Sequence, residues 1–142
     1  MKLRSFFVGL ILNFFSGVGL SGAEQFSLLE EADRAYLSGD FSGALTRYDD
    51  YLARYPGADT VWETHYWKGR TLLALSRYVE AQKEFLLAKD RVTDLVLRND
   101  AWLGYADALY YVGEWEGALS QYSDLLDSSQ AGERSYLLYQ VG

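Results

Sequence analysis

Residues 106–118 read ADALYYVGEWEGA, the third copy of a pattern that recurs at intervals of 37 residues. The earlier copies are ADRAYLSGDFSGA at residues 32–44 and GRTLLALSRYVEA at residues 69–81. Each copy begins with a small residue, carries an aromatic residue nine positions later, and ends with an alanine. A period of this length is typical of a protein built from stacked structural repeats.

Each copy predicts two helices joined by a short turn. Apolar residues recur at helical spacing on both sides of Gly39 and Gly113, and glycine readily adopts the left-handed conformation that ends many helices. Ser76-Arg77 takes the place of this turn in the middle copy. With no convincing strand pattern, the sequence predicts an all-α chain of six helices in three antiparallel pairs.

Helix ends and packing positions also follow from the pattern. Pro56-Gly57 is expected to end the second helix, and Thr60 with Glu63 resembles a capping box for the third. Alanines are expected where two helices approach closely, at Ala44, Ala81 and Ala118. Aromatic side chains four residues later should fill the wider gaps between pairs, at Tyr48, Phe85 and Tyr122.

The first 23 residues have the features of a secretory signal peptide. Lys2 and Arg4 precede an apolar stretch at 6–15, and small residues at 21–23 predict cleavage before Glu24. Retention as an anchor is the alternative, although glycine and polar residues interrupt the run and it is shorter than the roughly 20 apolar residues of a span. We therefore expect a periplasmic or secreted protein with no stable membrane span after cleavage.

Composition argues against several kinds of site. The net charge is −7 and no basic stripe is present, so nucleic acid is not an expected partner. The chain has no cysteine, which excludes disulfides and thiol chemistry. Residues 17–22 match G-x-G-x-x-G, but no second strand follows as nucleotide binding requires. The only histidine, His65, is expected to pack between helices. We predict a protein that is not an enzyme, with no cofactor and no metal.

The repeated residues resemble the tetratricopeptide repeat (TPR) family. Trp102 matches that family's first aromatic position, and Pro56 matches its proline. The resemblance implies a TPR α-solenoid over residues 24–142, with three repeats and the start of a fourth at 135–142, so the native chain is expected to continue further. The 37-residue period, longer than the usual ~34, resembles bacterial envelope proteins such as the periplasmic partner of the Tol–Pal system and the TPR lipoprotein of the outer-membrane assembly machine.

The TPR resemblance also implies a binding surface. In that family the first helix of each pair lines a concave groove. Carried onto this chain, the groove is rich in tyrosine, with acidic residues and one arginine. The residues expected to contact a partner are Asp33, Tyr36, Tyr66, Arg70, Asp107, Tyr110 and Tyr111. Tyrosine suits this role because it offers a large contact area and a hydroxyl group.

These observations favour a non-catalytic scaffold of the bacterial cell envelope that binds a peptide or protein in the groove. One alternative is a carrier that binds a small ligand or glycan on the tyrosine-rich face. The other is the interaction region of a longer enzyme whose catalytic domain lies downstream of Gly142.

Overall fold

The computed structural model describes residues 22–128, and all of their regular secondary structure is helical. A helix described over residues 22–37 is followed by α2 (Phe41–Arg54), α3 (Val61–Ala74), α4 (Tyr78–Ala88), α5 (Leu95–Val112) and α6 (Trp115–Ser128). The prediction of an all-α chain with six helices is confirmed. Most of the predicted signal peptide and the predicted start of a fourth repeat lie outside the described residues.

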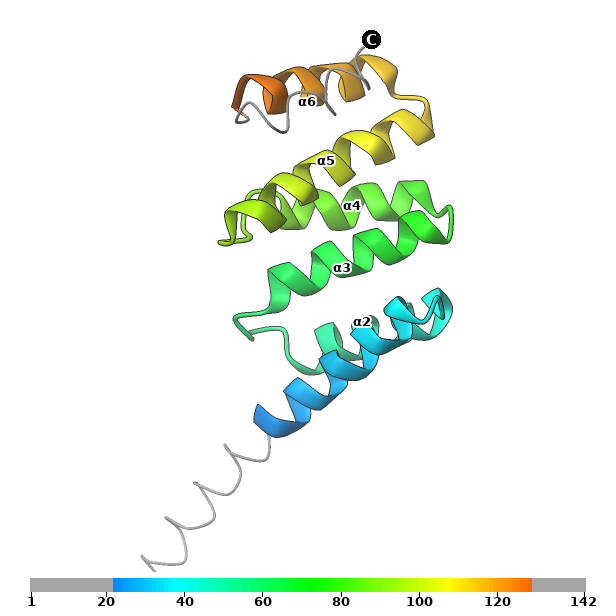
Figure 1. Ribbon diagram of the computed structural model, residues 1–142, viewed down its shortest axis with the longest axis vertical. Coiled ribbons are helices and arrows are strands. Elements are labelled where there is room, and N and C mark those ends of the chain that lie inside the picture. The colour runs from blue at the N-terminus through cyan, green and yellow to red at the C-terminus, as the bar shows by residue number, and fades with distance from the viewer. Residues whose placement is uncertain (1–21, 129–142) are drawn as a thin grey trace, which may run out of the picture.

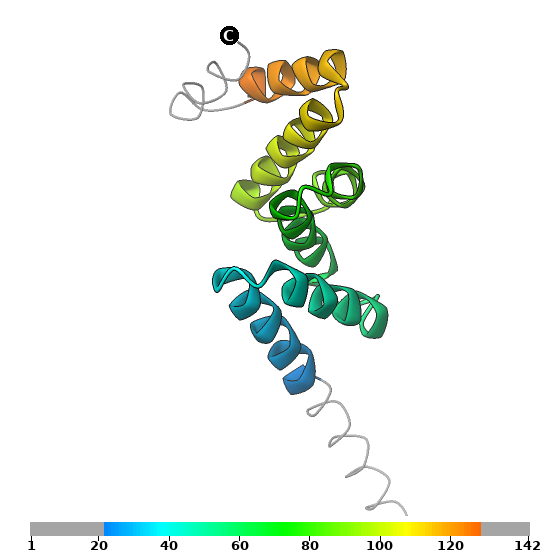
Figure 2. The same cartoon turned by 90° about the vertical axis from the view of Figure 1, so that its right-hand side faces the viewer.

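The helices are stacked along the long axis of the molecule in chain order (Figure 1). Each helix from α2 to α6 packs against the next one, and α3 also contacts α5. Figure 2 shows that the helix at 22–37, α3 and α5 share one side of the stack, whereas α2 and α4 lie on the other. Among residues 22–128, no helix has the length and apolar character needed to cross a bilayer.

Tyr48, Phe85 and Tyr122, one aromatic residue from each repeat, belong to the buried core, as the sequence predicts. Tyr48 and Phe85 are fully buried, and Tyr122 is 4% exposed. The three alanines four residues earlier, Ala44, Ala81 and Ala118, are also buried. The repeat period therefore predicts correctly which large and which small side chains fill the interior.

Phe85 of α4 lies against two glycines on neighbouring helices. A Cβ atom added to Gly69 of α3 would lie 3.0 Å from the Phe85 ring, and one added to Gly104 of α5 would lie 2.5 Å from it. Real Cβ atoms essentially never come as close as 2.5 Å to another heavy atom. The missing side chains at these positions therefore make room for the aromatic ring.

The turns between paired helices share one backbone conformation. Gly39 and Gly113 have φ angles of 82° and 92°, in the left-handed region that glycine tolerates best. Ser76, at the equivalent place in the middle copy, also has a positive φ angle, 58°. The replacement of glycine by serine leaves the turn geometry in place but puts a side chain in an unfavourable conformation.

The capping box predicted at Thr60 and Glu63 is wrong. Thr60 is the N-cap residue of α3, but its side chain makes no capping hydrogen bond. Its hydroxyl instead lies 2.5 Å from the hydroxyl of Tyr51, on α2. Asp40 and Asp94 do cap their helices, each by accepting a hydrogen bond from a backbone N–H three residues later.

Candidate functional site

A pocket opens across the helix at 22–37, α3 and α5, which lie on one side of the stack. Its volume is about 440 Å³. The apolar part of its lining consists of Leu73, Ala74, Leu103 and Gly104. Aromatic and charged side chains complete the lining: Tyr36, Arg70, Tyr78, Asp100, Asp107 and Tyr111. We call this cavity the groove pocket.

Four of the seven residues expected to contact a partner come together in the groove pocket. Tyr36 comes from the helix at 22–37, Arg70 from α3, and Asp107 and Tyr111 from α5. These residues lie on three different helices and are up to 75 positions apart in the sequence. The convergence arises because the first helices of successive repeats lie side by side.

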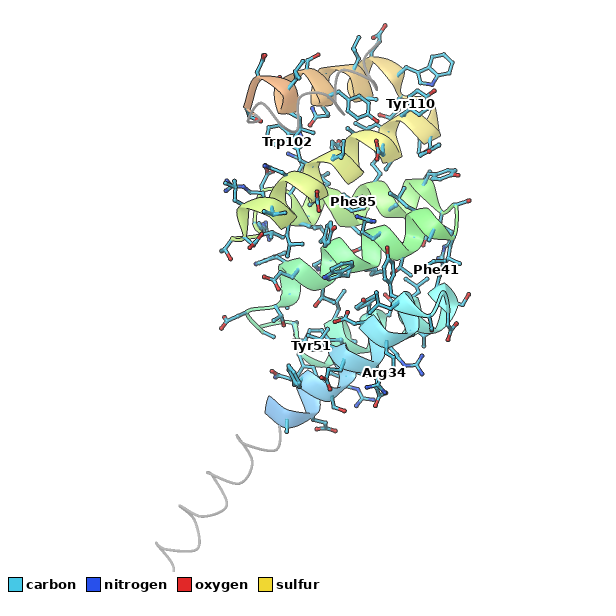
Figure 3. All side chains as sticks on the ribbon, viewed as in Figure 1. Arg34, Phe41, Tyr51, Phe85, Trp102 and Tyr110 are labelled. Carbon is cyan, nitrogen blue, oxygen red and sulfur yellow. The ribbon has the colours of Figure 1, made fainter. Side chains whose placement is uncertain are left out.

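The other three residues lie elsewhere. Tyr66 is 1% exposed and packs edge-on against Trp67 and Phe85, so most of its side chain belongs to the core. Asp33 is exposed and does not line the groove pocket. Tyr110 is 56% exposed and lies beside the pocket, in edge contact with Tyr111. In Figure 3, Tyr110 and Phe41 lie along one edge of the stack.

Tyr78 is a lining residue that the sequence analysis missed. It begins α4, on the second helix of its pair, and its ring stacks on Tyr111 with centroids 4.7 Å apart and planes 16° apart. The equivalent residue of the first repeat, Phe41, contacts Tyr36 with centroids 5.5 Å apart. An aromatic residue recurs at the start of the second helix in each repeat, and this pattern could have predicted that Tyr78 lies near the groove.

Two aspartates on first helices are held by tyrosines of the following helix. The Tyr48 hydroxyl donates to Asp33 Oδ1 at 2.7 Å, and the Tyr122 hydroxyl donates to Asp107 Oδ1 at 2.5 Å. Each tyrosine follows its aspartate by 15 residues, so the repeat preserves the pair.

The middle repeat replaces both members of this pair. Arg70 stands at the aspartate position and Phe85, which has no hydroxyl, stands at the tyrosine position. Arg70 Nη1 instead donates to the Tyr66 hydroxyl at 3.1 Å. The exchange frees the guanidinium from α4 and leaves it on the wall of the groove pocket.

The charged groups of the groove pocket do not neutralise one another by direct contact. Within residues 22–128, no ion pair of 4.0 Å or less involves Arg70, Asp100 or Asp107. Among the described residues, the one hydrogen bond that the Asp100 side chain accepts is long, 3.5 Å, and comes from the Tyr66 hydroxyl. Burial raises the pKa of Asp107, and this effect outweighs the opposing influence of the Tyr122 hydrogen bond and of the Arg70 charge.

A separate polar cluster lies between α3 and α4. Glu84 bonds His65 Nδ1 at 2.6 Å through one carboxylate oxygen and Lys68 Nζ at 2.7 Å through the other. Lys68 also pairs with Asp49 of α2 at 2.9 Å. His65 therefore packs between helices with a hydrogen-bond partner, and its ring also stacks on Trp62. Because its members are hydrogen-bond and ion-pair partners of one another, we interpret this cluster as a structural link between helices.

Within the described part of the chain, no three histidine or carboxylate side chains are grouped so that they could hold a metal ion. No family model matches the chain, and no curated protein matches it.

Proposed function

We propose that this protein is a non-catalytic TPR-type scaffold of the bacterial cell envelope, which binds a peptide or protein segment in the groove. The observation that supports this most directly is the convergence of Tyr36, Arg70 and Asp107 on one pocket from three first helices. A repeat protein binds an extended segment in this way, because each repeat adds one more helix to a continuous surface.

The composition of the groove pocket supports a peptide as its occupant. Its volume of about 440 Å³ falls within the roughly 300–1,000 Å³ of ordinary ligand pockets. The apolar part of the lining can accept an apolar or aliphatic side chain. The tyrosine rings and hydroxyls can contact both the side chains and the backbone of an extended segment. Exposed Tyr110 would extend this surface beyond the pocket.

The location in the cell envelope rests on the predicted signal peptide at residues 1–23 and on the long 37-residue period. The partner is accordingly proposed to be an envelope protein, encountered after export. The acidic net charge of −7 supports a protein partner over nucleic acid.

The experiment is a crosslinking pull-down from envelope extract with three baits. The first is the unaltered protein, the second carries Tyr36→Ala and Tyr111→Ala in the groove pocket, and the third carries Leu86→Ala, at an exposed position of α4 that does not line the pocket. Circular dichroism establishes that all three are folded. A protein captured by the first and third baits and lost by the second would support the proposal, after its binding is reproduced with purified components. Equal capture by all three baits would contradict it.

A further inference from the structure

The groove pocket has an excess of negative charge that nothing in the described structure neutralises. Asp100 and Asp107 line it together with only one cationic side chain, Arg70. No oxygen of either carboxylate lies within 4.0 Å of a cationic nitrogen in residues 22–128. A cation entering from outside would therefore find two carboxylates without a direct counter-ion, in a site where water is partly excluded.

Asp107 differs from Asp33, its counterpart in the first repeat, in its position relative to the groove pocket. Asp33 and Asp107 occupy equivalent positions, and each accepts a hydrogen bond from a tyrosine of the next helix. Only Asp107 lines the groove pocket, and it is less exposed than Asp33. The tyrosine bond engages Oδ1 of Asp107, so the same carboxylate still has an oxygen available to an incoming donor.

The walls of the groove pocket also suit a long basic side chain. Tyr36, Tyr78 and Tyr111 line the pocket together with the two carboxylates. Aromatic faces attract cations, and guanidinium groups stack on them especially well. The apolar part of the lining, which includes Leu73 and Leu103, can accept the aliphatic stem of such a side chain.

Arg70 limits how much positive charge the groove pocket can accept. Its guanidinium carbon lies 6.0 Å from the centroid of the Tyr66 ring, and Nη1 is engaged by the Tyr66 hydroxyl. Two carboxylates opposite one guanidinium leave a net charge of −1, which one basic side chain would balance.

We propose that the groove pocket selects a lysine or arginine side chain of the bound segment, whose cationic end pairs with Asp107 and Asp100 while its stem lies among the tyrosine rings. This inference rests on the proposed function, because it specifies which peptide the groove binds. Arg70 then opposes the ligand charge instead of attracting it.

The test uses the full chain and random dodecapeptides selected on it by phage display. Peptides that lose binding to the Tyr36→Ala/Tyr111→Ala protein are kept as groove ligands. Each is synthesised with its basic residues intact or replaced by norleucine, which keeps the aliphatic length without the charge. Affinities are measured by fluorescence anisotropy at two salt concentrations.

We expect norleucine replacement to weaken binding by at least about tenfold, the loss expected for a hydrogen bond to a charged group. Asp107→Asn should cause a similar loss, and Asp33→Asn, the matched change at the equivalent tyrosine-bound aspartate, should leave affinity unchanged. Asp100→Asn provides a second variant in case Asp107→Asn does not fold. Arg70→Gln should strengthen binding, and higher salt should weaken it.

The possible failures are distinguishable. Groove peptides that bind equally well with norleucine, or that lose affinity with Arg70→Gln, would overturn the selection of a basic side chain and leave the peptide-binding proposal in place. A selection that yields no peptide sensitive to Tyr36→Ala/Tyr111→Ala would instead contradict the proposed function itself.

Discussion

The ring of Phe85 occupies the space in which Gly104 would otherwise carry a side chain. An added Cβ atom at Gly104 would lie 2.5 Å from the Phe85 ring carbon Cζ. Phe85 is on α4 and Gly104 is on α5, so this contact sets how closely the second and third repeats approach. Gly104 also lines the groove pocket, and the same contact therefore positions one part of the pocket lining.

Gly104→Ala is expected to destabilise the protein. Overpacking costs about 1–3 kcal/mol, and this exceeds the roughly 0.5–1 kcal/mol that alanine gains over glycine within a helix. Urea denaturation provides the measurement. Gly117→Ala is the matched control, because its added Cβ would lie 3.7 Å from the nearest atom and should stabilise α6. A Gly104→Ala protein as stable as the unaltered one would show that Phe85 can move aside.

Tyr48→Phe should lower the free energy of unfolding by about 1–2 kcal/mol, because it removes a hydrogen bond to a carboxylate. The bond joins the hydroxyl of fully buried Tyr48 to Asp33, and so links two helices. Thermal unfolding followed by circular dichroism would measure the loss. Tyr110→Phe, at an exposed tyrosine, should leave the midpoint unchanged. Equal midpoints for both variants would contradict a stabilising role for the Tyr48–Asp33 bond.

Glu84→Gln should destabilise the protein at neutral pH, by about 1–3 kcal/mol for the loss of charge-assisted hydrogen bonds. Burial by itself would raise the pKa of Glu84, but the bonds with His65 and Lys68 outweigh it and lower the pKa. A carboxyl group with a lowered folded-state pKa stabilises the protein fully above its unfolded pKa and loses that contribution as pH falls through the folded value.

The difference in unfolding free energy between the unaltered protein and Glu84→Gln should therefore decrease below the ordinary carboxyl pKa of 4.5. Urea titrations at several pH values between neutral and acidic conditions would follow it. Glu80→Gln is the control, since Glu80 pairs with Arg77 on an exposed surface and should have little effect. A penalty for Glu84→Gln that stays constant with pH would refute the role of the Glu84 charge.

Ser76→Gly should stabilise the protein. The φ angle of 58° at Ser76 is unfavourable for serine, whereas Gly39 and Gly113 hold the equivalent turns without this cost. We expect a gain of about 0.5–1 kcal/mol, because the relief of left-handed strain exceeds the entropy that glycine loses on folding. Chemical denaturation would detect it. Ser42→Gly, at an exposed position of α2, should instead lower the free energy of unfolding. A loss of stability in both variants would argue against strain at Ser76.

The sequence predicts the helical skeleton well because the repeat fixes local features. Gly39 and Gly113 mark turns, and Tyr48 and Phe85 mark the core, since each of these roles depends on spacing along one or two neighbouring helices. The Asp33–Tyr48 pair could also have been found, because the same 15-residue spacing recurs in the third repeat.

Contacts that depend on competition between side chains were not predictable in the same way. The Thr60 hydroxyl was expected to cap α3, but the Tyr51 hydroxyl from α2 engages it. The partners of Glu84 come from the packing of α3 against α4, at separations that no helical period indicates. In the groove, Tyr66 has the spacing of a surface residue, yet Trp67 and Phe85 cover its ring.

The pairing of Phe85 with a glycine has a consequence for how this array can evolve. At the position occupied by Gly104, the preceding repeat has Trp67, which packs against the cluster that contains Tyr48. Excising 37 residues would keep the helical register, but it would place a glycine beside the cluster that contains Tyr48, where a tryptophan now packs. At each junction between repeats, the side chains that face each other thus have matching sizes. Recombination between copies would leave a void or a clash. Gain or loss of a repeat would therefore require compensating substitutions.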